Sequence, residues 1–76
     1  MSSKIYGKRA VELINKRCAV MNRTLTSVLA EVCVPYSTFR CWEKGRYNPS
    51  AYALECMALA RYDIYYILTG VKSNGK

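Results

Sequence analysis

Residues 25–44, LTSVLAEVCVPYSTFRCWEK, constrain the fold of this chain more than any other stretch. Pro35 is a helix-start signal, because proline at the first helical position loses no hydrogen bond. Gly45 suits the left-handed position that ends a helix. The apolar spacing around Pro35 therefore predicts two short helices that cross at a tight turn. The apolar residues with this spacing are Val28, Val32, Val34, Phe39 and Trp42.

Similar patterns predict three further helices, and no strand alternation or internal repeat interrupts them. Thr24, Ser50 and Asp63 are candidate N-caps, because their side chains accept hydrogen bonds from the first backbone N–H groups of a helix. Gly70 closes the last helix. We therefore predict an all-α, five-helix fold. Its helices are Lys8 to Met21, Leu25 to Val32, Pro35 to about Lys44, a fourth from after Ser50 to about Arg61, and Ile64 to Thr69.

The length and charge of the chain limit its function. Seventy-six residues make one small domain, which buries only roughly 60% of its unfolded surface and leaves no room for a separate catalytic or ligand-sensing domain. We divide the chain into an N-terminal arm (1–7), a helical domain (8–70) and a flexible tail (71–76). Twelve Lys and Arg residues against five Asp and Glu give a net charge of +7, which favours a polyanionic partner.

Several other functions are disfavoured. No apolar stretch is long enough to span a membrane, and the N-terminus lacks the pattern of a signal peptide, so we expect a cytoplasmic protein. The chain has no His and only one Asp, and no nucleophile lies at a telling distance from a base, so we expect no enzymatic activity. The four cysteines form no C-x-x-C pair. We therefore expect no metal or other cofactor, and treat the cysteines as reduced, small apolar residues.

Two segments resemble a known family. The run VPYSTFRCWEKG-x-x-NPS and the closing YDIYYILTG, residues 62–70, are similar to the lambda-repressor-like (Cro/Xre) family of helix-turn-helix proteins, and the resemblance covers Lys8 to Gly70. It implies a helix-turn-helix formed by the second and third helices. It also implies a Cro-like phage or prophage repressor in the bacterial cytoplasm, associated with the nucleoid. Such a protein binds an inverted-repeat operator as a homodimer, with half-sites roughly 34 Å apart.

The turn between these two helices allows two alignments with the family. In the ungapped register Cys33 occupies the position where the family usually has a glycine, and Leu29 occupies a position usually held by a small residue. If the turn were one residue shorter, Ala30 would take the small position instead. A left-handed Cys33 costs on the order of 1 kcal/mol. We prefer the ungapped register, and neither alignment moves the third helix.

The resemblance places the start of the third helix in the major groove of DNA. Arg40 is the strongest candidate for reading a base, because a guanidinium can donate two hydrogen bonds to guanine O6 and N7. The alternative is an Arg40 that faces solvent or a phosphate. For Ser37 and Cys41 the alternative is a passive role, Ser37 as a solvated residue at the helix end and Cys41 as a small side chain. The candidate base-reading residues are Pro35, Tyr36, Ser37, Arg40 and Cys41.

A second group of residues fits contacts with the DNA backbone. The start of the second helix offers backbone N–H groups to a phosphate, and the loop after the third helix follows the DNA backbone in the family. Ordinary surface charge is the alternative for each Lys or Arg taken singly. The candidate phosphate-binding residues are Arg23, Thr24, Thr26, Lys44, Arg46, Tyr47 and Asn48.

Other residues are assigned to packing or to association. Phe39, Trp42 and Met57 are predicted to be core residues. Glu43 resembles a structural acid of the family, with Arg17 as its nearest candidate partner. The aromatic cluster near the C-terminus fits either a dimer contact or core filling. The residues of this cluster are Tyr62, Tyr65 and Tyr66.

The sequence thus predicts a DNA-binding transcriptional regulator. One alternative is an antitoxin-like protein of the same fold, whose main task is to hold a partner toxin. An RNA-binding protein is a third possibility, although its aromatic residues would more often lie on sheets or loops.

Overall fold

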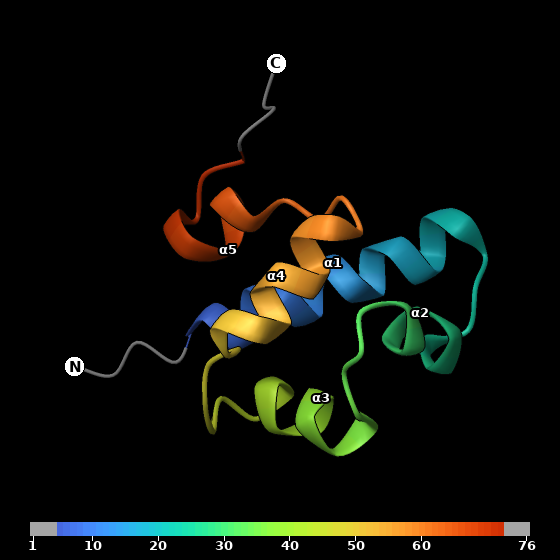
Figure 1. The fold of residues 1–76 in the computed structure, drawn as a ribbon, viewed down its shortest axis with the longest axis horizontal. Helices are drawn as coiled ribbons and strands as arrows, with labels where there is room; N and C mark the ends of the chain where they lie inside the picture. Colours follow the sequence, from blue (N-terminus) through green and yellow to red (C-terminus); the bar gives the residue numbers. More distant parts are fainter. Residues whose placement is uncertain (1–4, 73–76) are drawn as a thin grey trace.

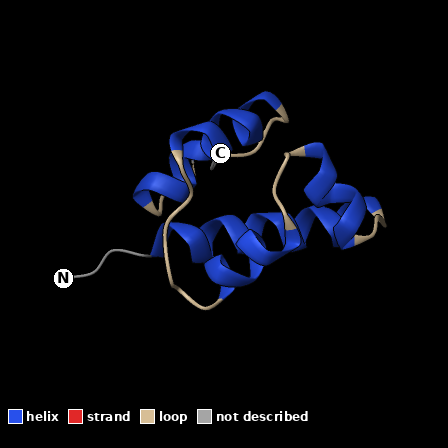
Figure 2. Cartoon of the chain, turned by 60° about the horizontal axis from the view of Figure 1, so that its bottom comes forward, coloured by secondary structure: helices blue, strands red, loops and turns tan. Residues whose placement is uncertain are grey.

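The computed structural model describes residues 5–72, and this part of the chain contains helices and no strand, which confirms the all-α prediction. The last four helices lie within two residues of their predicted bounds. Short loops join the helices (Figure 2). The elements are α1 (Ile5–Met21), α2 (Leu25–Glu31), α3 (Tyr36–Glu43), α4 (Ala51–Leu59) and α5 (Ile64–Thr69).

The first helix begins earlier than predicted, so the proposed N-terminal arm is wrong for residues 5–7, and residues 1–4 lie outside the described residues. The physical reason is tertiary packing. Gly7 is buried, and a Cβ atom added to it would lie only 3.1 Å from Trp42 Cβ and 3.0 Å from the carbonyl oxygen of Tyr47. The start of α1 is therefore pressed against α3. Of the predicted tail, residues 71 and 72 follow α5 outside any helix, and residues 73–76 are not described.

Helix α1 is the central element of the fold. It contacts α2, α3 and α5, while α4 packs against α5 (Figure 1). Phe39, Trp42 and Met57 are almost fully buried, as predicted. The core formed around α1 fixes the inner face of α3 and leaves its outer face in solvent. The remaining buried apolar residues are Ala10, Ile14, Val28, Leu29, Val32, Val34, Tyr62 and Ile67.

The three predicted N-caps are confirmed. The side chain of Thr24 accepts a hydrogen bond from the backbone N–H of Ser27 at 3.1 Å. Ser50 and Asp63 make equivalent bonds at the starts of α4 and α5. Each bond satisfies a backbone donor that the helix itself leaves unpaired. These short-range signals place the starts of three helices.

The turn between α2 and α3 has the conformation that the ungapped register predicts, because Cys33 is left-handed with φ +58°. The Val34 N–H donates to the Leu29 carbonyl at 3.0 Å and the Cys33 N–H donates to the Ala30 carbonyl at 3.3 Å. This pair of bonds is a Schellman motif, which usually brings together two apolar side chains on either side of the helix end. Leu29 and Val34 are both buried, whereas Ala30 is exposed.

We expect Cys33→Gly to raise the free energy of unfolding by about 0.5–1 kcal/mol. The left-handed conformation costs a side-chain-bearing residue roughly 1–2 kcal/mol, and the larger entropy of glycine in the unfolded chain offsets part of that gain. Urea unfolding measures the change. Ala30→Gly is the matched control, because it places the same residue inside α2 and should cost about 1 kcal/mol. Equal destabilisation by both substitutions would contradict the left-handed turn.

Candidate nucleic-acid interface

Helix α3 has one buried face and one exposed face. Phe39 and Trp42 anchor the buried face, and Tyr36, Ser37 and Arg40 lie on the exposed face. Pro35 is exposed and forms the N-cap, with no side-chain hydrogen bond to the first turn. The predicted base-reading residues at the start of α3 are therefore available to a ligand.

Arg40 belongs to a row of three side chains on this exposed face. Its Nη1 donates to the Tyr36 hydroxyl at 3.0 Å, and its Nε lies 3.0 Å from the Glu43 carboxylate. The hydrogen bond with Tyr36 raises the pKa of Arg40 above its usual value, and the Glu43 carboxylate adds a smaller effect in the same direction. Arg40 is a permanent cation whose position is set by its two neighbours.

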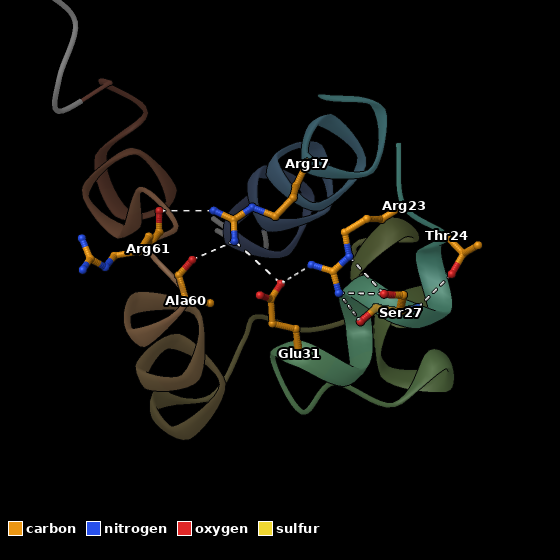
Figure 3. Close-up of polar contacts among 7 residues, drawn as sticks. All are labelled: Arg17, Arg23, Thr24, Ser27, Glu31, Ala60 and Arg61. Carbon is orange, nitrogen blue, oxygen red and sulfur yellow. Dashed lines mark hydrogen bonds and ion pairs between the residues drawn. The ribbon is translucent and has the colours of Figure 1, made fainter. Parts of the chain in front are cut away.

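The predicted pairing of Glu43 with Arg17 is wrong. Helix α1 meets α3 at Gly7, and Arg17 lies nearly three helical turns further on, on the order of 15 Å along the helix axis. Arg17 instead donates to the Ala60 carbonyl at 2.7 Å and lies 3.8 Å from the Glu31 carboxylate (Figure 3). It ties the end of α4 to α1 and α2.

Two of the three candidate phosphate contacts at the start of α2, Arg23 and Thr24, already make hydrogen bonds within the protein. Arg23 donates to the Ser27 hydroxyl at 2.7 Å and to the Glu31 carboxylate at 3.2 Å (Figure 3). The Thr24 hydroxyl is the cap of α2, and Thr26 is exposed. Thr24 and Thr26 are both exposed, and Arg23 is half-buried.

The loop after α3 holds the exposed cations Lys44 and Arg46. Tyr47 is also exposed, and its hydroxyl accepts a hydrogen bond from the Cys41 thiol at 3.2 Å. Cys41 is half-buried, and its thiol is bonded to the loop, so it is less accessible to a ligand than the exposed Arg40. The Asn48 Oδ1 is buried and accepts no hydrogen bond from the described residues, so this amide oxygen points inward and not toward a phosphate.

The C-terminal tyrosines have three different environments. Tyr62 is 8% exposed and belongs to the core, so core filling and not a dimer contact describes this residue. Burial raises the pKa of Tyr62, and its hydroxyl has no hydrogen-bond partner among residues 5–72. Tyr66 donates to the Glu12 carboxylate, and this bond raises the pKa of Tyr66. Tyr65 is the most exposed of the three and remains a candidate for a dimer contact.

The structure thus gathers part of the predicted site on α3 and its following loop. Comparison with protein-family models, curated proteins and solved structures found no match.

Among the described helices, none is long and apolar enough to cross a membrane. All four cysteines are free thiols, and Cys33 is exposed. The sequence did not predict that Gly7 packs against α3, because a glycine in a helical pattern carries no signal of its neighbour in space. It also did not predict that Arg17 contacts Ala60 and Glu31.

Proposed function

We propose that this protein is a sequence-specific, double-stranded DNA-binding transcriptional regulator of the Cro-like repressor type. In this proposal α3 enters the major groove and Arg40 contacts a guanine. The chain acts as a homodimer on an inverted-repeat operator and represses by excluding RNA polymerase.

The observation that carries the proposal is the exposed face of α3. A short helix that is fully anchored on one side presents a tyrosine, a serine and an arginine on the other, and two cations follow in the next loop. Side chains that donate hydrogen bonds to base edges, next to cations that neutralise phosphates, are the two components of a DNA reader. The net charge of +7 supports the same partner.

Selection of bound duplexes from a random pool tests the proposal. We expect a palindromic consensus with guanine in each half-site, together with a solution mass of two chains per bound duplex. A selection that enriches no sequence would overturn the proposal. Enrichment of a structured RNA over every duplex, in a parallel pool, would identify the protein as an RNA binder.

Arg46→Ala is expected to weaken binding to selected and random duplexes alike. Arg46 lies in the exposed loop after α3, where a cation contacts phosphate and carries no sequence information. The slope of log affinity against log salt concentration should become shallower by about one unit. Fluorescence anisotropy at several salt concentrations measures both effects. An unchanged slope would place Arg46 outside the interface.

A further inference from the structure

An apolar hollow lies between the second half of α1 and the turn that joins α4 to α5. Its volume is about 280 Å³. Val20 and Met21 line it although their side chains are 72% and 53% exposed, and Leu13 and Tyr62 complete the apolar wall. Exposed apolar side chains gathered beside a hollow commonly mark an interaction site.

Positive charge surrounds this hollow. Lys16, Arg17 and Arg61 line it, against the single carboxylate of Asp63. Asp63 caps α5 by accepting a hydrogen bond from the Tyr66 N–H, and Arg17 has Glu31 as an ion-pair partner. Lys16 and Arg61 are exposed. The hollow therefore combines an apolar wall with a cationic rim.

We infer that this hollow is a docking site for an acidic segment of a partner protein, which inserts apolar side chains between Lys16 and Arg61. Charge complementarity carries the choice of partner. A second copy docked through the same hollow would set Lys16, Arg17 and Arg61 against their own counterparts. A nucleic acid would satisfy the cations but would leave Val20 and Met21 uncovered. An acidic, apolar segment satisfies both parts of the surface.

The size and position of the hollow agree with this partner. A hollow of about 280 Å³ has room for a few side chains of a peptide. Gly7 and its contact with α3 lie at the opposite end of α1. A partner bound here would leave the exposed face of α3 open, so the inference does not depend on the proposed DNA binding.

Panning a displayed library of random short peptides against the immobilised full chain, without DNA, tests the inference. We expect enriched peptides with net negative charge and two apolar residues three or four positions apart. A synthetic enriched peptide should then shift the amide resonances of residues 16–21 and 61–63 in the labelled protein. Enrichment of neutral or basic peptides, no enrichment, or shifts confined to other residues would overturn the inference.

Two pairs of variants distinguish binding at this hollow from non-specific binding of the peptide. Val20→Ser should weaken binding of the enriched peptide about tenfold, the effect of losing one well-buried anchor. Leu59→Ser is its control, because Leu59 is equally exposed, at 77%, but does not line the hollow. Lys16→Glu should likewise weaken binding about tenfold, and Lys8→Glu on the same helix should not. Equal effects within either pair would refute the site.

Two further measurements test the other possible occupants, a second copy of this chain and a nucleic acid. If the wild-type chain self-associates and Val20→Ser disperses it, the hollow is an interface between copies of this chain. If a DNA duplex shifts residues 16–21 and Lys16→Glu weakens duplex binding more than peptide binding, the hollow belongs to a nucleic-acid site. Either result overturns the acidic-segment inference, and neither depends on whether the duplex is sequence-specific.

Discussion

Replacing Gly7 with valine is expected to lower the free energy of unfolding by about 2–3 kcal/mol, in the range typical of overpacking a buried site. A Cβ at this position would already lie 3.1 Å from Trp42 Cβ and 3.0 Å from the backbone oxygen of Tyr47. Valine adds two methyl groups beyond that atom. The Tyr47 oxygen belongs to the backbone and Trp42 is buried, so neither can simply rotate away. The start of α1 and α3 must therefore move apart to admit the two methyl groups.

Urea unfolding of two further variants isolates this effect. Ala19→Val places the same residue at an exposed position of α1 and should cost only about 0.6 kcal/mol of helix propensity. Gly7→Ala should change stability by less than about 1 kcal/mol, since the gain in helix propensity offsets the tight contact. Equal losses for Gly7→Val and Ala19→Val would mean that α1 and α3 do not approach closely at this glycine.

The sequence predicted the elements whose signals are local. An N-cap side chain bonds within its own first turn, so Thr24, Ser50 and Asp63 mark the starts of α2, α4 and α5 without any tertiary information. The left-handed Cys33 was expected from the family resemblance, through the ungapped register, and not from a local signal of its own.

Features that depend on distant residues were not predicted. Residues 5–7 join α1 because the buried Gly7 packs against Trp42, which is remote in sequence. The partner of Glu43 was wrongly assigned because the crossing point of α1 and α3 decides which arginine comes near. Periodicity indicates which face of a helix is apolar, but not where along its length a neighbour crosses.

In the candidate interface too, the sequence predicted the features that have a local pattern and missed the others. The amphipathic pattern of α3 predicted the exposure of Tyr36 and Arg40. It did not predict that Cys41 is bonded to Tyr47, or that the Asn48 oxygen is turned inward. Loop conformation decides these positions, and a loop has no periodicity from which to read it.

Arg40→Ala is expected to reduce discrimination between the selected and a random duplex by about 1–3 kcal/mol, the usual worth of a bidentate contact with guanine. Tyr36 and Glu43 hold the guanidinium on the exposed face of α3 before any ligand arrives. A side chain that is already ordered loses less conformational entropy on binding. Affinities of both duplexes, measured at one salt concentration, give the discrimination directly.

Arg46→Ala is the matched control for Arg40→Ala, because it removes the same charge from the following loop. Both side chains are exposed, so unfolding free energies should stay within about 0.5 kcal/mol of the wild type. The Arg46 variant should lose affinity for the two duplexes equally, whereas the Arg40 variant should lose it mainly for the selected one. Equal losses in the Arg40 variant would make Arg40 a phosphate contact, and the reading of bases would then fall to Tyr36 and Ser37.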